Sequence, residues 1–199
     1  MRNAEAYDLS VVLDDRWFEL PVAPSADVSG WARSAVAHAL ELRGAEEHDG
    51  RRRVWEQMFA AEVDLVTGDV DEARQVVAAY LLVPAADIVP VTAVSLHAMW
   101  VGPAGVEGAV AGAVVPESER FGAAEVDELD TAAGPCVRVR QVLLDGEEGT
   151  LRNAVVYVWD LPEPELVLVA SAVFGSPADA AVYGEVVDDL ATSVRLVAA

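Results

Sequence analysis

The sequence contains no lysine and a single cysteine, and its 13 basic residues, all of them arginine, face 34 acidic residues. The lone Cys136 excludes an intrachain disulfide and a metal site built from several cysteines. The formal net charge of −21 repels nucleic acid and anionic membrane surfaces, so we expect neither as a partner. This acidic balance favours a solvated surface or a basic partner protein.

Long apolar runs are also missing. The apolar stretches at residues 76–83 and 155–159 are far shorter than the ~20 residues that a membrane-spanning helix needs. Residues 1–8 lack the apolar core of a secretory signal. Both absences lead us to expect a cytoplasmic protein.

Recognisable catalytic and metal-binding motifs are absent as well. None of the three histidines, His38, His48 and His97, has a second ligand at the spacing of a metal site. No serine lies in a G-x-S-x-G motif, and the glycine-rich residues 102–108 match neither the dinucleotide fingerprint nor the P-loop, so they are interpreted as a turn. The acidic residues between 117 and 130 lack a cation-binding loop motif. We therefore expect no cofactor, no metal and no catalytic residue, and we favour a protein that is not an enzyme.

Two side chains leave an alternative open. Cys136 is expected on the strand face of Arg138 and Arg140, whose charges could lower the pKa of the thiol, but a small structural side chain is the favoured role. His97 is interpreted as a sheet residue packed against aromatic side chains rather than as a catalytic base.

Apolar residues, in contrast, are abundant, at 53% of the 199 residues. Such a chain can bury a sizeable core, and no repeat or long linker divides it. We therefore predict a single globular domain over residues 1–199.

Apolar alternation and helical spacing predict the secondary structure. The predicted strands are residues 9–13, 16–22, 74–83, 91–101, 124–129, 136–144, 151–160 and 166–174. The predicted helices are residues 27 or 29 to 42, residues 51–66, residues 104–114, and a last helix that follows the cap Ser176 and continues to Val197. The first two strands form a hairpin or two separate segments. Residues 91–101 also contain good helix formers, although their β-branched residues favour a strand.

The resulting order, β-β-α-α-β-β-α-β-β-β-β-α, predicts an α+β fold in which helices pack on an antiparallel, meander-rich sheet. Residues 151–159 and 166–174 are apolar on both faces, which predicts central positions in a sheet covered by helices. If residues 125–129 and 137–140 form a hairpin, two acidic residues of the first strand lie opposite two arginines of the second and help to set the register. These four residues are Glu125, Asp127, Arg138 and Arg140.

Four segments at turns and strand ends carry short motifs: RWFELP at 16–21, the acidic strand and AGPCVRVR at 125–140, YVWDLP at 157–162 and FGSP at 174–177. These segments resemble those of a family of small, mostly uncharacterised actinobacterial proteins. That family resembles the PsbP-like α/β/α sandwich, found in an extrinsic subunit of photosystem II, a Ran-binding nuclear import factor, bacterial lipoproteins and chaperone-like accessory proteins of secretion systems. The resemblance implies a fold whose members act mainly by binding other proteins, and it assigns no catalytic residue.

The only basic run, Arg51-Arg52-Arg53, begins a predicted helix, where the helix dipole disfavours cations. Such a violation can mark an interaction site, here with Trp55 as an apolar anchor. The run can also be a solvated turn. The missing catalytic residues, the large negative charge and the fold resemblance lead us to predict a non-enzymatic protein-interaction module of accessory, chaperone-like or immunity type, able to form a homodimer.

Two other functions remain open. The first is a small-molecule-binding protein with a groove between the sheet and the first two helices, lined by four side chains. These are Trp55, Met58, Phe59 and Tyr157. The second is an acid–base enzyme with paired carboxylates.

Overall fold

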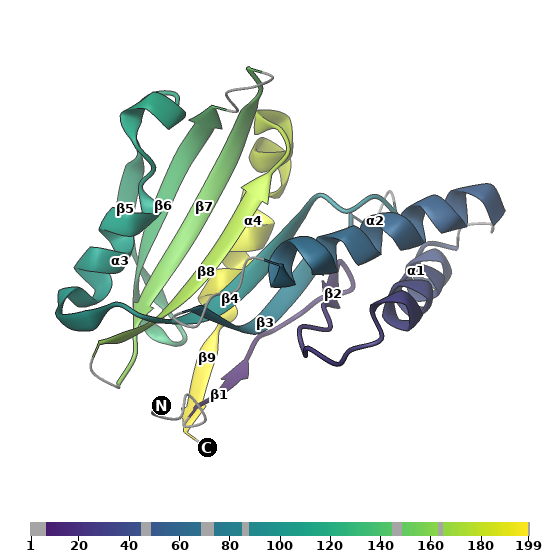
Figure 1. Ribbon diagram of the computed structural model, residues 1–199, viewed down its shortest axis with the longest axis horizontal. Helices are drawn as coiled ribbons and strands as arrows, with labels where there is room; N and C mark the ends of the chain where they lie inside the picture. Colours follow the sequence, from purple (N-terminus) through teal and green to yellow (C-terminus); the bar gives the residue numbers. More distant parts are fainter. Residues whose placement is uncertain are drawn as a thin grey trace.

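The computed structural model describes residues 7–44, 49–68, 74–84, 88–144, 149–162 and 165–198. Within these ranges the chain forms four α-helices and nine β-strands (Figure 1). The helices are α1 (Val28–Arg43), α2 (Asp49–Thr67), α3 (Gly105–Ala113) and α4 (Pro177–Ser193). The strands are β1 (Tyr7–Ser10), β2 (Trp17–Glu19), β3 (Arg74–Leu82), β4 (Thr92–Trp100), β5 (Glu125–Thr131), β6 (Gly134–Leu144), β7 (Leu151–Asp160), β8 (Leu166–Phe174) and β9 (Arg195–Ala198).

Seven of these strands form one antiparallel sheet in the order β2-β3-β4-β8-β7-β6-β5. The α+β class is therefore confirmed, and the last four strands of the sheet are the predicted meander. Strand β8 lies at the centre of the sheet with β7 beside it, which explains why both are apolar on both faces. Residues 91–101 are a strand, β4, and not a helix.

The two ends of the described chain pair in a separate two-stranded sheet of β1 and β9. The prediction that the last helix continues to Val197 is therefore wrong, because α4 ends at Ser193 and the backbone of Val194 is no longer helical. Pairing with β1 explains the change, since a partner almost the whole chain away supplies hydrogen bonds that helical spacing cannot reveal. The first two strands are separate segments and not a hairpin, because β2 pairs with β3.

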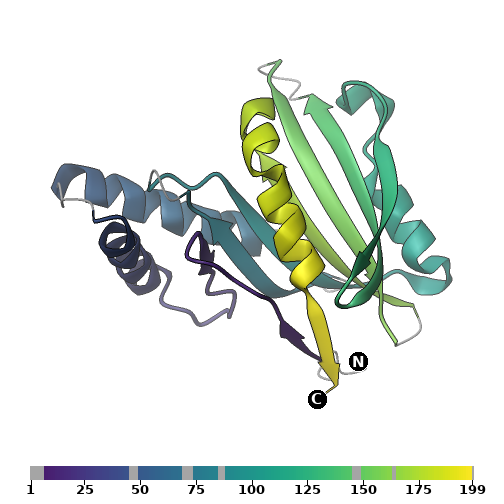
Figure 2. The ribbon, with the colours of Figure 1, turned by 180° about the vertical axis from the view of Figure 1, so that it is seen from behind.

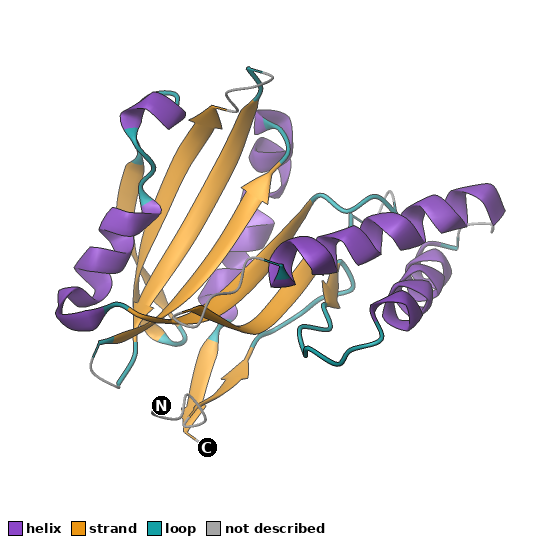
Figure 3. Ribbon diagram, viewed as in Figure 1, coloured by secondary structure: helices purple, strands orange, loops and turns teal. Residues whose placement is uncertain are grey.

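Helices cover both faces of the large sheet (Figure 3). Helix α4 crosses one face, which Figure 2 shows from the front, while α1, α2 and α3 lie on the other. Strand alternation divides the core accordingly. In β3, for example, Tyr80 and Leu82 belong to the cluster on the α4 side, whereas Ala79 and Leu81 pack toward α1 and α2.

The predicted caps and the predicted register are confirmed. Of the two candidate N-caps for α1, the structure uses Asp27, whose carboxylate accepts a hydrogen bond from the Gly30 amide at 2.9 Å. Ser176 caps α4 in the same way, accepting from the Asp179 amide at 3.1 Å. In the β5–β6 hairpin, Glu125 pairs with Arg140 and Asp127 with Arg138, and both pairs form salt bridges.

Candidate functional site

Helices α2 and α3 lie apart from each other on the same face of the sheet (Figure 1). Two cavities lie on this face, over β4, β8 and β7. One, of about 480 Å³, lies beside the C-terminal half of α2, and the other, of about 420 Å³, lies beside α3. Ser171 of β8 lines both cavities, so they are neighbours on the sheet. We call the two cavities together the trough.

The α3 side of the trough is apolar. The strands contribute Met99, Val101, Val156 and Val169, and α3 contributes Gly108, Ala109, Gly112 and Ala113. Gly112 lines this cavity, and a Cβ added there would meet no atom within 4 Å, so a larger side chain has room at this position. Gly112 is the penultimate residue of α3 and is exposed, so it lies at the rim of the cavity.

A chain of polar side chains crosses the floor of the trough. His97 Nε2 and Ser95 Oγ are hydrogen-bonded at 2.8 Å, and Ser95 Oγ and Ser171 Oγ are hydrogen-bonded at 3.1 Å. The serines face each other across β4 and β8. Because burying polar groups in a sheet is costly unless they are hydrogen-bonded, three such groups in a row are unusual for two central strands. This series of hydrogen-bonded side chains ends at the half-buried Ser171, which lines both cavities.

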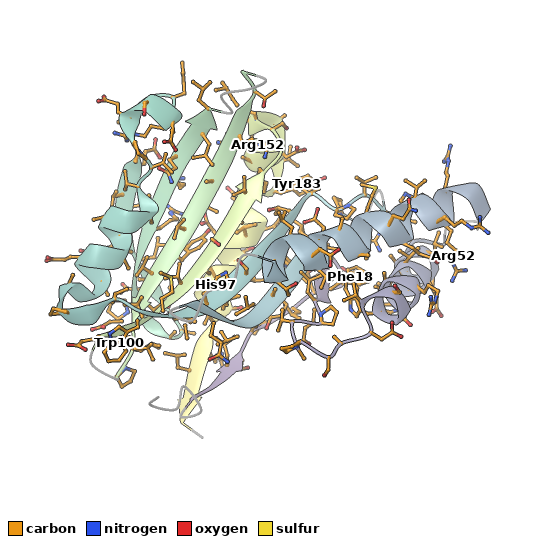
Figure 4. All side chains as sticks on the ribbon, viewed as in Figure 1. Phe18, Arg52, His97, Trp100, Arg152 and Tyr183 are labelled. Atoms are coloured by element: carbon orange, nitrogen blue, oxygen red, sulfur yellow. The ribbon has the colours of Figure 1, made fainter. Side chains whose placement is uncertain are left out.

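Two ionisable side chains lie at the α2 end of the trough. Glu62 of α2 is half-buried, and burial raises the pKa of its carboxyl group. Arg152 of β7 lines the same cavity and is exposed; Figure 4 labels it with His97 on the sheet between α3 and α2. This end of the trough is therefore polar, and the α3 end is not.

The residues predicted as an interaction site lie at the start of α2, away from the trough. Arg51 and Arg53 are exposed, and Arg52 Nε donates to Glu56 Oε1 at 2.9 Å, one turn further along the helix. Trp55 is half-buried and packs on the cluster formed with α1. Arg51 and Arg53 therefore lie at the start of a helix, as predicted. Trp55, in contrast, contributes to packing.

A cavity lies between the sheet and α2, without any residue of α1, and the lining predicted for a groove between the sheet and the first two helices is wrong. Phe59 is fully buried in the α1–α2 cluster, and Tyr157 is fully buried on the opposite face of the sheet. Helix α2 lines the trough with Glu62, Leu65 and Val66 instead. The signal that was missed is the pair of polar residues at 95 and 97, which interrupts the apolar side of a central strand.

The remaining candidate residues have structural surroundings. Cys136 is 2% exposed, and burial raises the pKa of its thiol to about 12, which outweighs the nearby Arg138, so the structural role is confirmed. His38 is exposed and contacts the ring of Phe18 edge-on, while His48 lies outside the described residues. Within the described ranges, no group of three or more histidine, cysteine or acidic side chains could hold a metal ion.

No family model matches the chain, and no curated protein matches it. In the described part of the chain, no helix is both long enough and apolar enough to cross a membrane.

Proposed function

We propose that the protein is a binding protein that holds a small amphipathic molecule in the trough. The observation that carries this proposal is the meeting of two cavities at Ser171, the end of a hydrogen-bonded chain of buried polar side chains. Ligand pockets are mostly apolar hollows of about 300–1,000 Å³ with a few placed polar groups, and the trough fits that description.

The two ends of the trough suggest how such a molecule lies. Its apolar part extends over Val156 and Val169 toward Gly112, and its polar group lies at Ser171. His97 and Ser95 hold the Ser171 hydroxyl through their hydrogen bonds, so this group is oriented before the ligand arrives. A neutral hydroxyl or carbonyl suits this site, since the hydroxyl of Ser171 can donate or accept a hydrogen bond.

Probe displacement tests this function. The neutral fluorophore N-phenyl-1-naphthylamine should bind with increased fluorescence, and 1-octanol should displace it. The variant Gly112→Leu fills the α3 side of the trough and should abolish both signals. Ala111→Leu adds the same side chain at the neighbouring position of α3, which does not line the cavity, and should leave them unchanged. If Gly112→Leu binds the probe as tightly as the unmodified protein, the trough is not the site.

A second candidate is the predicted protein-interaction module, in the form of a homodimer. It is favoured by a stripe along α2, formed by Val54, Met58, Ala61 and Leu65, because Val54 is 53% and Leu65 is 74% exposed. The N-terminal turn of this helix carries the three arginines, and its C-terminal half carries acidic residues such as Asp64. Antiparallel pairing of α2 with its copy brings the basic end of one helix to the acidic end of the other.

A further inference from the structure

Strand β5 is the outermost strand of the large sheet at the end that lies beside α3 (Figure 1). It is seven residues long, and its register with β6 runs from Glu125 to Thr131 without a shift. The strand at the other end of the sheet, β2, is three residues long. The outer N–H and C=O groups of an edge strand can pair with a further extended chain, so β5 is the longer of the two edges at which such a chain can bind.

An apolar hollow of about 300 Å³ lies beside this edge, between α3 and β5. We call it the β5 hollow. Four valines line it, namely Val106 and Val110 of α3, Val126 of β5 and Val137 of β6. The side chain of Val126 is 53% exposed and the other three valines are half-buried, so solvent reaches the β5 hollow. In a chain that pairs with β5, every second side chain lies on the α3 face of the sheet, where the one nearest Val126 can enter the β5 hollow.

The charged side chains around the β5 hollow are acidic. Glu107 of α3 and Glu128 of β5 line it, and Asp130 follows Glu128 on the same face of the strand. All three are exposed, and none forms an ion pair with another residue that the structure describes. Asp127 also borders the β5 hollow, but its carboxylate is paired with Arg138 on the α4 side of the sheet. Three carboxylates at the edge are therefore available to an incoming basic side chain.

The sign of these charges selects the chain that can pair with β5. Like charges on adjacent strands are destabilising, and charged edge strands oppose pairing between copies of one protein. Since this protein has a net charge of −21 and contains no lysine, a second copy is repelled from the edge. A basic chain is attracted by the same field, and its side chains can form cross-strand pairs of opposite charge.

We propose that β5 binds an extended, basic segment of another protein as an additional strand of the large sheet. Main-chain hydrogen bonds to β5 hold this segment, and one apolar side chain lies in the β5 hollow against Val126. Lysine or arginine side chains of the segment face Glu107, Glu128 and Asp130. The β5 hollow shares no lining residue with the trough, so the proposal is independent of the function proposed there.

Fluorescence anisotropy with three dye-labelled peptides of equal charge tests the kind of partner. The probe is Lys-Val-Lys-Val-Lys-Val-Lys, which alternates basic and apolar side chains. Lys-Ser-Lys-Ser-Lys-Ser-Lys lacks the apolar side chains, and Lys-Val-Lys-Pro-Lys-Val-Lys lacks a central N–H group and does not fit a strand. We expect each control peptide to bind at least about 5-fold more weakly than the probe, because it loses apolar burial or main-chain pairing. Equal binding of all three peptides would reduce the interaction to attraction by net charge and overturn the proposal.

Two charge reversals locate the site. Glu128→Lys should weaken binding of the probe by about 3- to 10-fold, because one attractive pair at an exposed position becomes repulsive. Glu41→Lys makes the same change at an exposed position of α1, which packs at the β2–β3 end of the sheet, and should change binding by less than about 2-fold. Circular dichroism spectra of both variants should match that of the unmodified protein. If the two reversals weaken probe binding equally, the β5 edge is not the site.

Discussion

Replacing Asp188 with alanine should destabilise the protein by about 2–4 kcal/mol, because one carboxylate holds two partners. It accepts a hydrogen bond from the fully buried Tyr157 and another from Arg138, whose side chain is 12% exposed. Without Asp188, the Tyr157 hydroxyl has no acceptor among these groups, which costs about 1–3 kcal/mol.

The loss at Arg138 is smaller. A charged hydrogen bond contributes about 1.5–3 kcal/mol, but Asp188 is itself 29% exposed and Arg138 keeps its bonds to Asp127, so we take about 1 kcal/mol for this part. For a protein of this size the sum corresponds to a decrease in Tm of about 4–16 °C, measured by differential scanning calorimetry.

A double-mutant cycle with Tyr157→Phe makes the reasoning refutable. In the unmodified protein this change removes a hydrogen bond and should cost about 0.5–1.5 kcal/mol. In the Asp188→Ala protein it removes a buried hydroxyl that has lost its acceptor, so it should be neutral or stabilising. The coupling energy from urea unfolding should therefore be at least about 0.5–1.5 kcal/mol.

The matched control is Asp189→Ala, which removes the same charge from the next residue of α4, an exposed one. It should change the free energy of unfolding by less than about 0.5 kcal/mol. If Tyr157→Phe costs the same with and without Asp188, the hydrogen bond between these two residues contributes nothing to stability and the reasoning fails.

Two further predictions concern α2. Because burial raises the pKa of Glu62 in the folded state, its contribution to stability is fully present below the unfolded pKa and is lost as the pH rises through the folded pKa. Urea unfolding should therefore show that Glu62→Gln gains stability relative to the unmodified protein as the pH rises from 4 to 7. A difference in the free energy of unfolding that does not change with pH would contradict this prediction. For the α2 homodimer, light scattering should show a concentration-dependent dimer that is lost in Val54→Asp but kept in Val182→Asp, which changes a valine of α4 that is more exposed than Val54. A protein that stays monomeric at every concentration would end the dimer proposal.

Features set by neighbouring residues could be predicted from the sequence. The bounds of β7 and β8 match the predicted residues 151–160 and 166–174, because each strand is a short apolar run ended by turn residues. The Ser176 cap of α4 is equally local, since the serine, the proline and the first-turn acid follow one another. The ionic register of the β5–β6 hairpin follows from one short turn.

Features that depend on residues far apart in the sequence could not be predicted in this way. Strand β9 owes its conformation to β1 at the other end of the chain, and helical spacing predicted a helix there. The trough has the same origin, since Ser95 and Ser171 are separated by 76 positions in the sequence and meet only because β4 pairs with β8. Serines and a histidine in separate apolar strands do not reveal that they are neighbours.

Because β4 pairs with β8, the large sheet cannot form completely until β8 has been synthesised. Strand β4 ends at Trp100 and β8 begins at Leu166. At a rate of synthesis of about 5–20 residues per second, roughly 3–15 s pass between the synthesis of β4 and that of its partner strand. During that interval an apolar strand edge of the nascent chain is open to other chains. A molecule in the trough would contact groups of both strands, so it could bind only after β4 and β8 have paired, and its binding would then oppose their separation.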